Sequence, residues 1–181
     1  KDIPAYDPEG SRKLLAEAGF PDGLQVVLSC QQARAEPMMA QALKESAAGA
    51  FDTTLNILPS ANYWDIWTAV PLGITIWAHR PLGTMVLALA YTGDAEGKPA
   101  PWNETYWVDE EFSTILKQAE QTLDVEERRA LMCQWEDIQM ERGSVGIAFW
   151  TSVWYIAHEK VQNVAAHPTN YDILHDAWID A

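Results

Sequence analysis

The chain has 181 residues, of which 48% are hydrophobic and 21% charged, a composition typical of a folded globular domain rather than a disordered segment. Twelve basic against 26 acidic residues give a formal net charge of −14, which disfavours binding to nucleic acid or to an anionic membrane surface. No apolar run approaches the ~18 residues that a membrane-spanning helix needs, so no membrane insertion is predicted.

The first half of the chain alternates between helix and strand signals. Asp7 followed by Pro8 is typical of a helix start, and Gly19 of its end. The elements expected next are a strand over residues 24–30, a helix from Pro37 to about Gly49, a strand over residues 51–58 and a short helix over residues 61–67. This order predicts an α/β layered domain whose strands are joined by helical crossovers.

Residues 73–81 are expected to be the central feature of this domain. Residues 73–77 are apolar and β-branched, as in a buried central strand, whereas His79 and Arg80 stand where that strand should end, and Pro81 prevents further strand pairing. Because ligands of open α/β sheets bind outside the carboxyl ends of the strands, this stretch is the best candidate for a ligand-facing element. The alternative is an edge turn whose arginine pairs with a surface carboxylate.

The second half begins with a helix expected over residues 82–91, followed by the longest irregular stretch, residues 92–107, a length that is usually functional or disordered. Asp109 should begin the next helix, with Phe112, Ile115, Leu116 and Ala119 on one face. Asp124 with Glu127 forms a capping box for a long amphipathic helix that stops at Gly143.

Beyond Gly143 the sequence becomes apolar and strand-like, and three strands are expected over residues 145–150, 153–157 and 161–165. The two cysteines do not form a disulfide framework. Cys133 falls on the expected apolar face of its helix, which favours a buried thiol.

No catalytic or metal-binding constellation stands out. The segment that starts at His158 begins like a zinc-protease helix, but Gln162 occupies the place of the second histidine. Ser144 lacks the glycines of a nucleophile elbow, no Gly-rich phosphate loop is present, and the four histidines lack ligand spacing. Neither a metal nor a cofactor is therefore predicted.

Several segments resemble the family 5 extracellular solute-binding proteins, the peptide- and nickel-type receptors of ABC transporters. The most specific is Tyr6-Asp-Pro-Glu, followed by the Lys-Leu-Leu-Ala-Glu-Ala-Gly-Phe-Pro-Asp-Gly run that ends at Gly23. The Asp-Val-Glu-Glu-Arg-Arg run from Asp124, the Trp102-Asn103 pair and the apolar stretch from Val145 occur in the order that the family shows.

The resemblance implies a type II periplasmic-binding-protein-like lobe, with a mixed sheet flanked by helices. Residues 1–144 would form this α/β ligand-binding lobe, and residues 145–181 would return to a second lobe that lies outside the sequence. The chain, which opens at Lys1 without an initiator methionine or a signal peptide, is then expected to be cut from a longer protein.

The resemblance also implies a ligand cleft beside the strand that carries Trp77. Peptide-binding members commonly place an aspartate three residues after this tryptophan, to pair with the peptide's amino group. Here that position is Arg80, whose guanidinium suits a carboxylate instead. The ligand contacts expected from this chain are Trp77, His79 and Arg80, with Tyr63 and Trp64 in addition.

The resulting hypothesis is the substrate-binding component of an ABC importer, located in the periplasm, which captures a short peptide or other small organic solute and delivers it to the membrane permease. The alternative is a carbohydrate-binding module that uses its tryptophans as sugar platforms, against which the helix–strand alternation argues. An enzyme is the third choice and is not favoured. An exposed apolar patch is expected where the second lobe is absent, formed by Phe149, Trp150, Trp154, Tyr155 and Ile156. This segment should therefore either pack onto a second copy of the chain, as self-association of the fragment, or be locally disordered.

Overall fold

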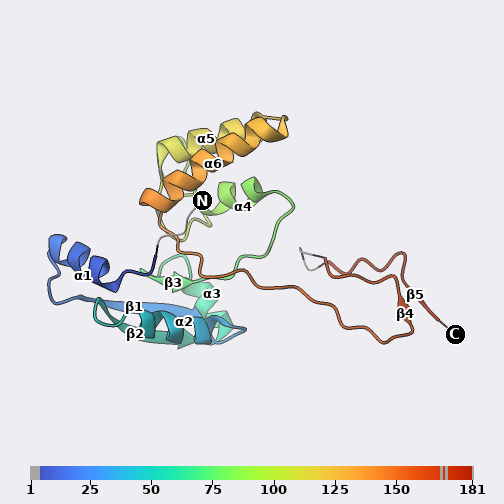
Figure 1. The fold of residues 1–181 in the computed structure, drawn as a ribbon, viewed down its shortest axis with the longest axis horizontal. Coiled ribbons are helices and arrows are strands. Elements are labelled where there is room, and N and C mark those ends of the chain that lie inside the picture. The colour runs from blue at the N-terminus through green and yellow to red at the C-terminus, as the bar shows by residue number, and fades with distance from the viewer. Residues whose placement is uncertain (1–4, 168, 170, 181) are drawn as a thin grey trace. The chain divides into compact units, whose positions relative to one another are not determined.

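The architecture comes from a computed structural model that describes residues 5–167, 169 and 171–180 (Figure 1). The chain divides into two compact units, Lys1–Ile76 (unit 1) and Trp77–Ala181 (unit 2). In the part of the chain that is described, no helix combines the length and the apolar character required to cross a bilayer.

Unit 1 is a three-stranded sheet with helical connections. Along the chain its elements are α1 (Pro8–Glu17), β1 (Leu24–Gln31), α2 (Glu36–Ser46), β2 (Phe51–Leu58), α3 (Ser60–Ile66) and β3 (Gly73–Ile74). The strand order is β2-β1-β3, and β1 is parallel to both neighbours. The predicted α/β alternation is thereby confirmed, and β1 and β2 agree with the expected strands to within one residue.

The prediction of a central strand over residues 73–77 is wrong. The central strand is β1, which pairs with β2 along its whole length, whereas β3 is a two-residue strand at the sheet edge that pairs only with Ser29 and Cys30. From Ile74 onwards the chain bonds to a side chain and not to a neighbouring strand. The Tyr63 hydroxyl donates to the Ile74 carbonyl (3.0 Å) and lies 3.1 Å from the Thr75 hydroxyl. Strand pairing therefore stops where α3 packs against the strand end.

The core of unit 1 lies between the sheet and α2. It consists of Leu28 and Cys30 from β1, Ala40 from α2 and Ile74 from β3, with Met39 and Leu55 packed against them. The N-cap predicted at Asp7 is confirmed, because its side chain accepts a hydrogen bond from the Gly10 amide at 2.8 Å.

Unit 2 is mainly helical. Its elements are α4 (Gly83–Ala90), α5 (Glu110–Gln121), α6 (Val125–Arg142), β4 (Val161–Gln162) and β5 (Trp178–Ile179), the last two forming an antiparallel pair. Helices α5 and α6 lie side by side as a hairpin (Figure 1), and the four residues predicted for the buried face of α5 are all buried. Both predicted helix starts are confirmed, since Asp109 and Asp124 accept hydrogen bonds from backbone amides of the first helical turn.

Two predictions for unit 2 are wrong. Cys133 is exposed, because the buried stripe of α6 runs through Met132, Trp135 and Ile138, and Cys133 falls outside it. Residues 145–157 form neither of the two expected strands, and the third is reduced to β4. A strand needs a neighbour for its backbone hydrogen bonds, and the described chain supplies none to this segment.

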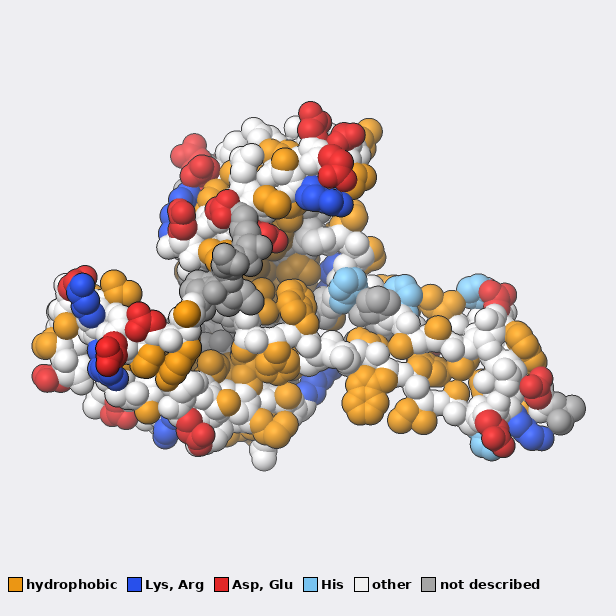
Figure 2. Space-filling view, viewed as in Figure 1, with side chains coloured by type: hydrophobic (Ala, Val, Ile, Leu, Met, Phe, Trp, Pro, Cys, Tyr) orange, Lys and Arg blue, Asp and Glu red, His pale blue; other side chains and the backbone are white. Residues whose placement is uncertain are grey.

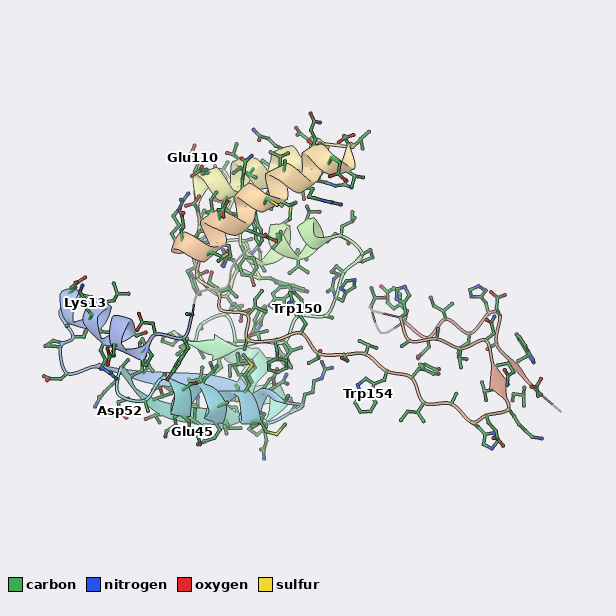
Figure 3. All side chains as sticks on the ribbon, viewed as in Figure 1. Lys13, Glu45, Asp52, Glu110, Trp150 and Trp154 are labelled. Atoms are coloured by element: carbon green, nitrogen blue, oxygen red, sulfur yellow. The ribbon has the colours of Figure 1, made fainter. Side chains whose placement is uncertain are left out.

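The apolar side chains of residues 147–157 are accordingly exposed, as expected. Trp150 is 83% exposed, Trp154 77% and Ile156 86%. Hydrophobic side chains line this extended part of the chain in Figure 2, and Trp154 projects from it in Figure 3.

Candidate ligand-binding site

The residues predicted to contact a ligand are divided between the two units. Tyr63 and Trp64 lie on α3 of unit 1, whereas Trp77, His79 and Arg80 begin unit 2.

The two aromatic residues of α3 differ in exposure. Tyr63 is wholly buried, and its hydroxyl holds the end of β3 through Ile74. Even Gly73 fits closely here, since a Cβ atom at this position would come within 2.8 Å of that hydroxyl. Trp64 is 43% exposed and lies edge-on between the rings of Tyr63 and Trp67, with centroids 5.8 and 5.5 Å away. Tyr63 thus supports the strand end, and Trp64 is the member of the pair with exposed ring surface.

Trp77 is fixed by a carboxylate and a second indole ring. Its Nε1–H donates to Oε1 of Glu104 at 3.0 Å, and its ring centroid lies 6.0 Å from that of Trp102 at an interplanar angle of 58°. Trp77 is half-buried and Trp102 is 49% exposed. Burial, together with the negative charge of Glu104, raises the pKa of Tyr91 to about 12. The three side chains Trp77, Trp102 and Glu104 form a cluster, here called the tryptophan–glutamate cluster.

The loop that carries Trp102 and Glu104 is irregular, as predicted, but it is held by one buried side chain. Asn103, 3% exposed, donates from Nδ2 to the carbonyls of Thr92 (3.1 Å) and Trp107 (2.8 Å). Its Oδ1 accepts from the backbone amide and the hydroxyl of Thr105. Asn103 thereby joins both ends of the loop and fixes the residues on either side of it.

His79 and Arg80 follow Trp77 in a segment without helix or strand. His79 is exposed. Nη1 of Arg80 donates to the carbonyls of Ala78 (3.0 Å) and His79 (3.3 Å), and no ion pair of Arg80 with a carboxylate is found in the described part of the chain. Among the described residues, no surface carboxylate holds this arginine as the alternative reading of the sequence would require.

A buried carboxylate stands at the carboxyl end of β1, at the start of α2. Glu36 is fully buried, and its Oε1 accepts from Nε2 of Gln31 at 2.9 Å. Burial raises the pKa of Glu36. Three smaller effects lower it: hydrogen bonds from the Gln31 amide and the Ile76 backbone, and the positive charge of Arg34. Burial and the Glu36 charge in turn raise the pKa of the Cys30 thiol.

Sequence reasoning did not assign a role to Glu36 or Glu104. Glu36 precedes Pro37 at a helix start of a common type, so nothing in the sequence indicates that its side chain is buried. Glu104 follows the Trp102-Asn103 pair that carried part of the family resemblance, and this position in a long loop was the available signal. Among the described residues, no group of three or more potential metal ligands is found.

The chain matches no protein-family model and no curated protein. Solved structures do match. A dipeptide-binding protein from Pseudoalteromonas sp. SM9913, in complex with Met-Leu, is 16% identical over 99% of this chain, with a TM-score of 0.74. NikA from Staphylococcus aureus, in complex with Ni(L-His)2, is 18% identical over 96% (TM-score 0.71), and the periplasmic binding protein DppA from Helicobacter pylori, in complex with the peptide STSA, is 21% identical over 77% (TM-score 0.67).

This chain spans 37%, 38% and 28% of the length of those three structures, respectively. The expected resemblance to peptide- and nickel-type binding proteins is thus confirmed at the level of the fold, and the mainly helical, parallel-sheet architecture does not suit the all-β module considered as the alternative. The chain has the α/β fold of a segment of a type II periplasmic binding protein.

Proposed function

We propose that this chain is part of the substrate-binding component of an ABC importer, which captures a short peptide or another small organic solute in the extracytoplasmic space and passes it to the membrane permease. Support comes from the shared fold over nearly the whole chain with proteins that bind Met-Leu and Ni(L-His)2. Capture would occur by hinge closure of two lobes around the solute, without bond chemistry.

The observation within this chain that carries the proposal is the state of Arg80. Of the five N–H donors of a guanidinium, those on Nη1 meet local carbonyls, and no carboxylate among the described residues neutralises the charge. The planar fork matches a carboxylate, which the C-terminus of a peptide or an organic acid supplies. Trp77 and His79 are proposed as further contacts from unit 2, and Trp64 and Tyr63 as contacts from unit 1.

The test uses the intact protein that carries this chain. A thermal-shift screen against short peptides, opines, sugars and metal chelates identifies the solute class, because a ligand that binds the folded state raises the melting temperature. Calorimetry then compares the parent with Arg80→Ala, Arg80→Lys and Arg80→Asp.

A charge-assisted hydrogen bond contributes roughly 1.5–3 kcal/mol. Arg80→Ala should therefore weaken binding of a carboxylate ligand by about ten- to a hundredfold. Arg80→Asp should weaken it further through repulsion, and Arg80→Lys should recover part of the loss.

Arg129→Ala is the matched control, because Arg129 is exposed and pairs only with Glu126 on the same helix face among its described ion pairs. It should bind like the parent. Unchanged affinity of Arg80→Asp would remove Arg80 from the site, and conversion of the solute during the titration would point to an enzyme instead.

A further inference from the structure

We propose that Glu36 is a proton-dependent positioning residue: with its proton bound it holds the chain at Ile76, and loss of the proton weakens that hold. Ile76 is the last residue of unit 1, and the candidate contacts Trp77, His79 and Arg80 come directly after it in the sequence. The importance of this point for solute capture rests on the proposed function, whereas the interactions themselves lie within unit 1.

The loop between β1 and α2 returns the Glu36 side chain to the strand that precedes it. Gln31 is the last residue of β1, and Glu36 is the first of α2. Between them Arg34 has a φ of 51°, a left-handed conformation that is uncommon for a residue other than glycine. Nε2 of Gln31 donates to Oε1 of Glu36 at 2.9 Å, and both side chains are buried. The carboxyl group of Glu36 is thereby fixed at the carboxyl end of β1.

The same carboxyl group also reaches the chain that follows β3. Strand β3 pairs with β1 only at Ser29 and Cys30, so sheet pairing has ended before Ile76. In the described part of the chain, the Ile76 amide has no backbone partner. It bonds instead to the Glu36 carboxyl group. Glu36 therefore takes the place that a longer β3 would have had in holding the backbone at this point.

One oxygen of this carboxyl group is left without a partner. Oε2 of Glu36 is shielded from solvent, and no hydrogen bond to it is found among the described residues. A carboxylate shares its negative charge between both oxygens, and a buried charge without a full set of donors costs more free energy than a buried neutral hydroxyl. The arrangement therefore favours the neutral acid, in agreement with the pKa of Glu36, which burial raises.

The charges around Glu36 do not offset its ionisation. Arg34 is exposed, and its positive charge is the smallest of the three effects that lower the pKa of Glu36. Cys30, the titratable neighbour on β1, is a buried thiol whose pKa is raised by burial and by the Glu36 charge, so it is neutral as well. Among the described residues, an ionised Glu36 has only Gln31 and Ile76 as donors. Local opening that admits water to Oε2 would relieve the unpaired charge.

The direction of the pH dependence follows from proton linkage. The closed structure binds the Glu36 proton more tightly than an open structure in which water restores the ordinary pKa of 4.5. Opening therefore releases the proton, and the open fraction should grow as pH rises above 4.5. The increase is limited to about tenfold per pH unit and levels off above the raised pKa.

A carboxyl group with a purely structural role is the competing explanation, for instance one in which a buried water satisfies Oε2 in both protonation states. The charge distinguishes the two explanations. Glu36→Gln keeps an oxygen that accepts from Ile76 but has no proton to lose. A structural glutamate would give the same pH profile as this variant, whereas a proton-dependent positioning residue would not.

The experiment is hydrogen exchange on the intact protein without a ligand, measured at peptides that cover residues 75–80 and corrected for the intrinsic pH dependence of amide exchange. From pH 5 to pH 7 the protection of these amides in the parent should fall by at least about threefold. Glu36→Gln should show protection that does not change with pH, and Glu36→Ala should lose protection at both pH values. Glu45→Gln is the matched control, because Glu45 is an exposed carboxylate of the same helix that accepts from Gln41, and this variant should follow the parent.

Three results would overturn the inference: constant protection of the parent between pH 5 and pH 7, an equal fall in Glu36→Gln and the parent, or parent-like protection of Glu36→Ala at pH 5. Each would show that the proton or the carboxyl group of Glu36 does not control this segment, and the proposed function would stand. Failure of every solute in the thermal-shift screen would instead refute the proposed function. The exchange experiment needs no solute, so the two failures are distinguishable.

Discussion

Replacing Asn103 by alanine tests whether one buried side chain holds the loop of residues 92–107. The Asn103 side chain makes four hydrogen bonds, two as donor to the carbonyls of Thr92 and Trp107 and two as acceptor from Thr105. A hydrogen bond contributes about 0.5–1.5 kcal/mol net, and a buried group left unpaired costs about 1–3 kcal/mol. Since the partners are only part-buried and water can reach some of them, we expect a loss of roughly 2–4 kcal/mol in the free energy of unfolding of unit 2.

Urea denaturation followed by tryptophan fluorescence measures this loss. Asn62→Ala is the matched control, because Asn62 is exposed on α3, and its change should stay within about 0.5 kcal/mol. Asn103→Asp should be as damaging as alanine or worse, because it keeps the acceptors for Thr105 but turns a carboxylate towards two carbonyl oxygens. A stability of Asn103→Ala within 0.5 kcal/mol of the parent would refute the idea that this residue organises the loop.

Two further predictions follow from buried or paired carboxylates. The pKa of Glu36 is raised above its ordinary value of 4.5 by burial, so the folded state binds this proton more tightly than the unfolded state. Melting temperatures measured across about pH 4–7 should therefore show the parent losing stability relative to Glu36→Gln as pH rises. A difference in melting temperature between the two proteins that does not change with pH would contradict this. Asp109 caps α5 through the Phe112 amide and binds Arg142, whose hydrogen bond lowers its pKa below 3.8. Asp109→Ala should therefore lower the free energy of unfolding more than Asp109→Asn does, since the cap contributes about 0.5–2 kcal/mol. The loss of stability in Asp109→Asn should shrink as pH falls through the lowered pKa of Asp109. A loss that does not change with pH would contradict a contribution from the charge.

The sequence predicts the regular elements well where the signal is local. Helix starts at Asp7, Asp109 and Asp124 depend on a side chain that caps its own first turn, and all three are confirmed. The alternation over residues 51–58 predicts a strand, and β2 spans those residues, with Phe51, Thr53 and Leu55 less exposed than Asp52 and Thr54.

The elements that were wrongly predicted depend on neighbours that lie far away in the sequence. Residues 73–77 have strand composition, but whether they form a central or an edge strand is decided by which strand β1 pairs with along its length. Cys133 shows how finely a helix face is defined: a shift of one residue moves a side chain by about 100° around the helix, which places Cys133 outside the buried stripe of Met132, Trp135 and Ile138.

The candidate site likewise contains one residue that the local sequence indicates and one that only the fold brings into place. Arg80 stands out in the sequence by its position after an apolar stretch, and the structure adds that it lacks a carboxylate partner among the described residues. Glu104 carries little local signal beyond its place after the Trp102-Asn103 pair, since a glutamate in an acidic loop is normally solvated. Its contact with Trp77 arises from the fold of the loop around Asn103, which sequence spacing does not encode.

The structure of residues 145–157 also depends on a partner that is distant in sequence. The apolar composition of this segment predicts two strands, which the structure does not contain, because a strand exists only when another backbone completes its hydrogen bonds. The described chain offers no such backbone, so side chains such as Trp150 and Ile156 stay more than four-fifths exposed. Exposed apolar surface of this kind is covered when a partner becomes available. The predicted return of this segment to a second lobe and the predicted self-association of the isolated chain would therefore both cover the same exposed apolar side chains. A chain in which the segment packs on a second lobe should self-associate less than the isolated chain.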